Sequence, residues 1–190
     1  MQERILDKIA EPFNIELPTG DTMLSMLDEV LPAIRKRSED LNEEEYYLNR
    51  SWIEMSDDVE FNAIWLYRFE EGGQLRSFRD GESEMGSWEN LGENKMTMGS
   101  SFASTTLYTL AFLDGDFLIL KRYGNLENID EAKYRLFVRE ALATKLDWRE
   151  AIEYLVNKYK SVTTPFVALS LFLILMIILF FVLSYGGIGS

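Results

Sequence analysis

The sequence predicts a mainly β protein with flanking α-helices, built around an eight-stranded antiparallel up-and-down barrel. Three observations predict this fold class. Short apolar segments separated by turn residues fill residues 45–141, helical periodicity flanks them on both sides, and an uncharged apolar run lies near the end of the chain. We therefore expect N-terminal helices, the barrel, a C-terminal amphipathic helix and one transmembrane helix.

Residues 1–40 are predicted to form an N-terminal helical segment. Leu24, Leu27, Leu31 and Ile34 form an apolar stripe at helical spacing. The turn at residues 18–21 precedes this stripe and is predicted to cap the helix through Thr19 or Asp21. Pro32 lies inside the stripe and predicts a kink or an early end of the helix.

Residues 45–141 are predicted to form the barrel. Eight strand candidates begin with YYLNRSWIEM and end with YRLFVRE, and turn residues such as Asp80-Gly81 and Asp114-Gly115-Asp116 join them. An antiparallel meander of this kind closes most simply into a barrel, because closure removes both exposed edges. A barrel of about eight strands leaves room only for its own side chains or for one small ligand.

Residues 145–161 are predicted to form an amphipathic neck helix. Asp147 and Glu150 have capping-box spacing, and Trp148, Ala151 and Leu155 lie on one apolar face.

Residues 165–185 are predicted to form a single transmembrane helix. The run from Phe166 to Leu183 carries no charge. Extended through Tyr185 as a helix, it would measure about 30 Å, the thickness of the hydrocarbon core of a bilayer. Lys158 and Lys160 precede it and no charge follows, so the positive-inside rule places the N-terminal part in the cytoplasm, as in a tail-anchored protein. The predicted anchor residues are Pro165, Phe166, Leu171, Phe172, Leu175, Leu179, Phe180, Leu183 and Tyr185.

Composition excludes several classes of function. The chain has no cysteine and no histidine, which rules out disulfides, thiolate metal sites, a Ser-His-Asp relay and histidine-ligated metals. Its net charge of −13 disfavours nucleic acid and anionic lipid surfaces as partners. The acidic clusters lack the register of a dedicated calcium loop. We expect no enzyme, no cofactor and no metal site. The N-terminus, MQERILDKIAEPF, has no apolar stretch typical of a secretory leader.

Three segments resemble the small lipocalin-like domains that are common in Bacteroidota. They are WLYRFEEGGQLRSFRDGESEMGSWENL, LYTLAFLDGDFLILKRYGN and YRLFVRE, and together they cover about half of the chain. The matching positions are 67–69 with Gly72 and Gly73, 86–88, 113–120 and 136–140. The resemblance implies the barrel and a tendency to bind something apolar. Many members of this family are exported or lipid-anchored, whereas this chain has a C-terminal apolar helix instead.

Aromatic residues of the barrel segment are the candidate site residues. Either they line a pocket for a lipophilic ligand or they form the core of the barrel, since aromatic side chains serve both purposes. The candidates are Trp65, Tyr67, Phe69, Trp88, Tyr108, Phe112 and Phe117.

Taken together, these features predict a tail-anchored, single-pass protein of the bacterial inner membrane, with its N-terminal domain cytoplasmic and its C-terminus across the membrane. The barrel is expected to be a binding or scaffolding module, an accessory subunit of a larger integral membrane protein complex. The bilayer would be contacted through residues 165–185. The alternative is a carrier or sensor of a small lipophilic ligand taken from the inner leaflet.

Overall fold

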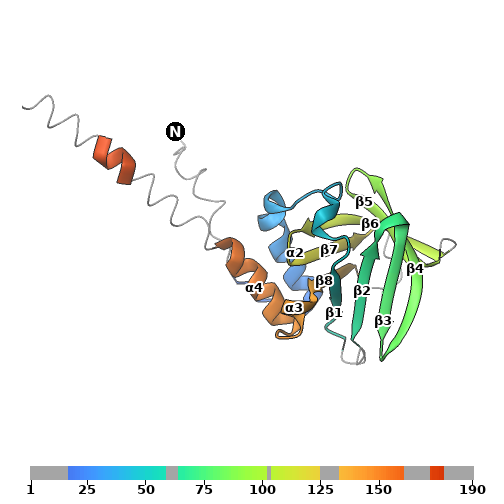
Figure 1. Cartoon of the computed structure of the whole chain (residues 1–190). Helices are drawn as coiled ribbons and strands as arrows, with labels where there is room; N and C mark the ends of the chain where they lie inside the picture. The colour runs from blue at the N-terminus through green and yellow to red at the C-terminus, as the bar shows by residue number, and fades with distance from the viewer. Residues whose placement is uncertain (1–16, 59–63, 102–103, 125–132, 161–171, 178–190) are drawn as a thin grey trace, which may run out of the picture. The chain divides into compact units, whose positions relative to one another are not determined.

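The computed structural model describes residues 17–58, 64–101, 104–124, 133–160 and 172–177 (Figure 1). The chain divides into two compact units, of which one runs from Leu17 to Leu155 and contains the barrel. Of the other unit, the structure describes residues 156–160 and 172–177.

Eight strands form one closed barrel, in which each strand pairs antiparallel with the next and the last pairs with the first (Figure 1). The predicted eight-stranded antiparallel barrel is thereby confirmed. Closure satisfies the backbone of both terminal strands, which an open meander would leave as edges. The strands are β1 (Ser51–Met55), β2 (Trp65–Glu70), β3 (Gln74–Arg79), β4 (Glu82–Gly92), β5 (Lys95–Ser101), β6 (Ser104–Leu113), β7 (Phe117–Arg122) and β8 (Tyr134–Arg139).

Tight turns join several of these strands as their sequences predict. Asp80 and Gly81, between β3 and β4, have φ values of 51° and 87°, the left-handed conformation that a two-residue hairpin turn requires. Between β6 and β7, Asp114 Oδ1 accepts hydrogen bonds from the backbone N–H groups of Asp116 at 2.7 Å and Phe117 at 2.8 Å. The Asp114 carboxylate therefore stabilises the turn itself.

A β-bulge in β6 changes which of its side chains face inward. The register with β7 shifts between Leu110 and Phe112, so that Leu110 pairs with Leu120 and Leu113 with Leu118. The buried side chains inside the barrel, among them Trp52, Phe69 and Phe137, form what we call the interior cluster. Leu113 belongs to this cluster and Leu110 packs against it. Strict alternation from Leu110 would instead have placed Phe112 there.

One end of the barrel is closed by residues 38–49, which we call the strap and which include the 3-10 helix η3 (Glu44–Tyr46). Leu41 and Tyr47 of the strap are fully buried in the interior cluster. The Tyr47 hydroxyl donates to the Leu41 carbonyl at 2.9 Å, and Trp52 Nε1 donates to the Tyr47 carbonyl at 3.1 Å. We call this the strap end; the opposite end, with the Asp80-Gly81 turn, is the hairpin end.

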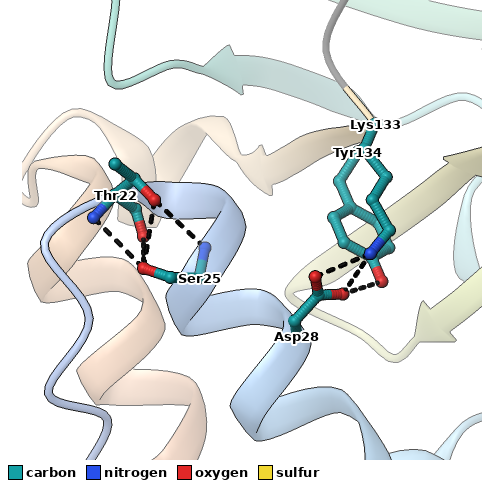
Figure 2. Close-up of polar contacts among 5 residues, drawn as sticks. All are labelled: Thr22, Ser25, Asp28, Lys133 and Tyr134. Carbon is teal, nitrogen blue, oxygen red and sulfur yellow. Dashed lines mark hydrogen bonds and ion pairs between the residues drawn. The ribbon is translucent and has the colours of Figure 1, made fainter. Parts of the chain in front are cut away.

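Helix α2 (Met23–Ile34) begins with a capping box, shown in Figure 2. Thr22 Oγ1 accepts from the Ser25 N–H at 3.2 Å, and Ser25 Oγ accepts from the Thr22 N–H at 3.2 Å. The prediction that Thr19 or Asp21 caps this helix is wrong. The helix begins at Met23, so Thr22 is the N-cap residue. Pro32 lies inside α2, whose α-helical geometry ends shortly afterwards at Ile34 and is followed by the 3-10 helix η2 (Arg35–Arg37).

Helix α2 is attached to the barrel through Asp28 (Figure 2). The Asp28 carboxylate accepts from Lys133 Nζ at 2.6 Å and from the hydroxyl of Tyr134, on β8, at 2.7 Å. Met26, Leu27 and other apolar residues of the helix are buried. The helix therefore covers part of the outer face of the barrel.

Helix α4 (Trp148–Lys160) follows the short helix α3 (Glu140–Ala143). Its predicted capping box is confirmed, since the Asp147 N–H donates to Glu150 Oε2 at 3.0 Å and the Glu150 N–H donates to Asp147 Oδ1 at 2.8 Å. The Tyr154 ring lies 6.2 Å from that of Phe117, on β7. Strand β7 is consequently buried on both faces, with Phe117 and Ile119 outside and Leu118 and Leu120 inside.

Candidate functional site

The interior of the barrel is filled largely by its own side chains. Phe69 lies at the centre, with its ring 5.8 Å from those of Tyr47 and Trp88 and 6.2 Å from that of Phe137, all in edge-on geometry. Trp52, Phe69 and Phe137 are fully buried. Towards the strap end, aromatic packing occupies the volume that a ligand would need.

A pocket of about 150 Å³ remains at the hairpin end. A cavity of about this size holds one benzene molecule, whereas pockets for drug-sized ligands measure about 300–1,000 Å³. The pocket therefore has room for a single ring or a short chain. It is lined by Trp65, Tyr67, Leu75, Ser77, Glu84, Met85, Gly86, Met98, Gly99, Ser100 and Arg135.

Close packing of strand backbones shapes one wall of this pocket. A Cβ atom at Gly86 would collide with the carbonyl oxygen of Gly99 on the neighbouring strand, and one at Gly99 would collide with the carbonyl oxygen of Ser104. Glycine is therefore required at both positions, and the wall is backbone rather than side chain.

Arg135, one of the lining residues, belongs to an ion pair. Arg135 of β8 donates from Nε to Glu54 Oε1 and from Nη2 to Glu54 Oε2, both at 2.6 Å, with Glu54 on the adjacent strand β1. The two side chains are only 19% and 15% exposed. This two-point geometry is the arrangement in which an arginine and a carboxylate interact most strongly.

Aromatic rings surround the guanidinium group. Its carbon lies 5.0 Å from the ring centre of Tyr67 and 4.9 Å from that of Phe137, close enough for cation–π attraction. Its Nη1 donates to the thioether sulfur of Met98 at 3.4 Å. Arg135 is thus fixed on several sides, and it also forms a side-chain hydrogen bond with Tyr67.

Protonation states in the pocket are fixed by burial and by this ion pair. Burial alone would lower the pKa of Arg135, but the hydrogen bonds and the charge of Glu54 outweigh it and hold that pKa above its ordinary value. Burial, reinforced by the negative charge of Glu54, raises the pKa of Tyr67 to about 12. Arg135 is therefore a cation and Tyr67 a neutral phenol at neutral pH.

The predicted aromatic site residues are divided among three places. Trp65 and Tyr67 line the pocket, and their rings stack at 6.1 Å. Phe69, Trp88 and Tyr108 belong to the packed interior cluster. Phe112 and Phe117 are buried outside that cluster; Phe117 packs against α4, and the bulge in β6 turns Phe112 away from the interior.

Sequence reasoning missed the ion pair formed by Arg135, which lines the pocket, and Glu54. Glu54 and Arg135 each occupy an inward-facing position of a strand that otherwise carries apolar residues inward, such as Trp52 on β1 and Phe137 on β8. Opposite charges at inward positions of the first and last strands of a closed barrel would have indicated the pair.

A second concavity, an open groove of about 660 Å³, lies at the strap end. Its lining includes the carboxylates of Glu44, Glu71 and Glu89, and none of the described lining residues is basic. Leu48 and the buried Trp88 supply its apolar surface. Gly72 and Gly73, both with positive φ, form the turn that borders it. We call this feature the acidic groove.

Most of the predicted membrane anchor lies outside the described residues, including Pro165, Phe166, Leu171, Leu179, Phe180, Leu183 and Tyr185. Residues 172–177 are helical, and each side chain from Phe172 to Ile177, including Leu175, is about half exposed or more. Within the described part of the chain, no helix combines the length and the apolar character needed to cross a membrane.

Comparison with known proteins found no matching family model, no similar curated protein and no similar solved structure.

Proposed function

We propose that this chain is a tail-anchored, single-pass membrane protein whose acidic barrel docks on a larger integral membrane protein at the cytoplasmic side of the inner membrane. In this role the barrel is a binding and scaffolding module. The observation that carries the proposal is the acidic groove at the strap end, which combines three glutamates with the apolar side chains of Leu48 and Trp88.

Charge complementarity supports this choice of partner. The cytoplasmic loops of inner-membrane proteins carry an excess of lysine and arginine. The chain has a net charge of −13, and all of its charged residues precede Pro165. A tethered acidic module would be attracted to such basic loops while being repelled by the anionic lipid surface between them.

The exposed apolar helix at residues 172–177 supports the membrane tether. Six consecutive large hydrophobic side chains are exposed there, within the longer uncharged run from Phe166 to Leu183. An exposed apolar surface of this kind is typical of a segment that contacts lipid or another protein. Insertion into the bilayer would remove these side chains from water.

The filled interior favours docking over the carriage of lipids. The pocket that the described residues form at the hairpin end, about 150 Å³, is smaller than the usual site for a drug-sized ligand, and the charged Arg135 is part of its wall. A lipid carrier remains the second candidate, for which the aromatic residues Trp65 and Tyr67 at the pocket are the favouring observation.

Salt-dependent co-purification would test the docking role. The full chain, extracted in mild detergent, is expected to retain a stoichiometric integral membrane protein that dissociates as the salt concentration rises. Replacing Glu44, Glu71 and Glu89 together by glutamine should abolish retention. The matched control, Glu29→Gln with Asp80→Asn and Glu82→Gln, removes the same charge outside the acidic groove and should leave retention unchanged.

Two results would count against docking. One is equal retention by both triple variants, which would exclude the acidic groove as the docking surface. The other is a defined bound lipid, detected by native mass spectrometry of the full chain released from detergent, which would support the carrier instead.

A further inference from the structure

We propose that the first part of strand β4 is a docking edge for an extended segment with lysine or arginine at alternate positions. The segment would add to the barrel as a further strand, with two of its cations beside Glu82 and Glu84. We call residues 82–85 the free edge. They lie at the hairpin end, so this partner is separate from the membrane protein that docks in the acidic groove. The inference does not depend on that docking role.

The free edge is paired on one side only. Strand β3 pairs with residues 82–85 throughout. Strand β5, on the other side, pairs with β4 only from Ser87, opposite Gly99, onwards. Among the described residues, no strand pairs with the free edge on that side, and all four of its residues are exposed. An edge of this kind presents N–H and C=O groups with which another strand can pair.

The turn before the free edge decides which backbone groups point outward. The pair of residues that flanks a two-residue turn is hydrogen-bonded, and such pairs alternate along an antiparallel ladder. Glu82 directly follows the Asp80-Gly81 turn, so the backbone of Glu82 and of Glu84 pairs with β3. The N–H and C=O groups of Ser83 and Met85 point the other way. These two residues therefore offer four backbone groups to a further strand, which is the basis of recognition by strand addition.

The side chains of the free edge indicate the chemistry of the partner. Glu82 and Glu84 lie on one face of β4, and neither forms an ion pair within the described part of the chain. A strand along this edge places every second side chain beside them, so lysine or arginine at those positions would form cross-strand pairs of opposite charge. Met85 lies on the opposite face, is 59% exposed and would contact an apolar side chain.

The pocket at the hairpin end borders the free edge and leaves the same sign of charge. Its lining includes Glu84 and Met85 of the free edge and Ser100 of β5. Of the two charged residues in this lining, Arg135 is paired with Glu54, whereas Glu84 is not paired with a described residue. The uncompensated charge beside the edge is therefore negative, which favours a cationic segment.

A second copy of this chain fits the free edge less well. Two free edges paired with each other would bring the Glu82 and Glu84 side chains of both copies side by side. Like charges opposite one another destabilise a strand pair, and charged side chains protect exposed edges against self-pairing. A basic segment from another protein would turn the same carboxylates into favourable contacts.

A short peptide with alternating cations tests the proposal. The probe, acetyl-Thr-Val-Lys-Thr-Lys-Val-Thr-amide, is titrated into the full chain in non-ionic detergent at low salt, with the backbone amide NMR signal of Ser83 as the reporter. A saturable shift is expected, with a Kd on the order of 0.1–1 mM. No saturable shift would overturn the proposal.

Two matched peptides separate strand addition from attraction by charge alone. Thr-Lys-Val-Thr-Val-Lys-Thr, with the same end groups, keeps the composition, but its lysines are too far apart to lie beside Glu82 and Glu84 together. It should bind at least about threefold more weakly. Methylation of the central backbone nitrogen of the probe removes the N–H that would donate to the Ser83 carbonyl, and should abolish binding. Equal binding of either matched peptide would contradict strand addition.

Substitutions in the chain localise the binding. Met85→Pro removes an N–H that faces the free side, where β3 does not use it, and should abolish the shift. Glu82→Gln with Glu84→Gln should weaken binding at least about threefold, and this variant retains the test if Met85→Pro fails to fold. The control, Glu71→Gln with Glu89→Gln, removes the same charge from the acidic groove and should leave binding unchanged. Equal weakening by both double variants, or a wild-type dimer that Met85→Pro dissociates, would overturn the proposal.

Discussion

Glu54 of β1 and Arg135 of β8 join the first and last strands of the barrel through two contacts of 2.6 Å. Glu54 lies directly opposite Phe137 in the register, so Arg135 is its diagonal neighbour on the same face. The pair therefore spans the seam at which the barrel closes, where its loss would weaken the closure directly.

Removing one partner of this pair should lower the stability of the fold strongly, whereas replacing both partners by apolar residues should not. Glu54→Gln leaves a buried guanidinium without its counter-charge and should lower the free energy of unfolding by about 3–5 kcal/mol. The double variant Glu54→Leu with Arg135→Met should recover most of that loss, because no charge is left unpaired. Urea unfolding of the full chain measures both. A loss below about 1 kcal/mol for Glu54→Gln would show that the pair is unimportant for stability.

Truncation at the centre of the interior should create a cavity. Phe69 is fully buried among aromatic rings, and Phe69→Ala should cost about 3–5 kcal/mol of unfolding free energy. Met85→Ala is the control, because the Met85 side chain is 59% exposed; it should change stability by less than about 0.5 kcal/mol. Equal effects of the two substitutions would contradict the packed interior.

Tyr67 should ionise only at high pH. Burial and the charge of Glu54 raise the pKa of its phenol to about 12, so the neutral form is favoured in the folded state. Between about pH 10 and 12 the folded protein keeps this proton, whereas the unfolded chain has lost it. The free energy of unfolding should therefore fall as the pH rises through this range. The difference in ultraviolet absorbance between the wild type and Tyr67→Phe should titrate near 12; titration near 10 would show that Tyr67 is solvated.

Asp28 should make the attachment of α2 sensitive to acid. Burial by itself would raise the pKa of Asp28, but the hydrogen bonds from Lys133 and Tyr134 and the charge of Lys133 lower it below its ordinary value of 3.8. A carboxyl group whose pKa is lowered by folding stabilises the folded state at pH values above its pKa in the unfolded chain. This stabilisation is lost as the pH falls through the pKa of the folded state.

The test for Asp28 is the pH dependence of urea midpoints. Asp28→Asn should be less stable than the wild type at neutral pH, and the difference should shrink below a pH of about 4. Because the Asp28 side chain is 44% exposed, the effect should be modest and should decrease with salt. A difference that is constant from neutral to acid pH would show that the charge of Asp28 does not contribute.

The barrel could be predicted from sequence because its evidence is local. A strand is predicted from the alternation of apolar and polar residues along it, and a turn from residues such as Asp80-Gly81. Both patterns involve only a few neighbouring residues. The capping box of Asp147 and Glu150 is local in the same way.

The placement of Phe112 and the ion pair could not be read so directly. The bulge in β6 shifts the alternation by one residue without a glycine or proline to mark it, so Phe112 was expected among the inward side chains. Glu54 and Arg135 are 81 positions apart, and only closure of the barrel brings them together. Their role depends on topology rather than on the residues around each of them.

Site-specific photo-crosslinking from the acidic groove tests the docking role most directly. A photoreactive residue at position Glu89, in the full chain in its native membrane, is expected to capture one integral membrane protein, with the crosslink mapping to a cytoplasmic loop rich in lysine and arginine. The same residue at Glu82, near the Asp80-Gly81 turn, should not capture it. No adduct from Glu89, an equal adduct from Glu82, or a crosslink to lipid alone would contradict docking through the acidic groove.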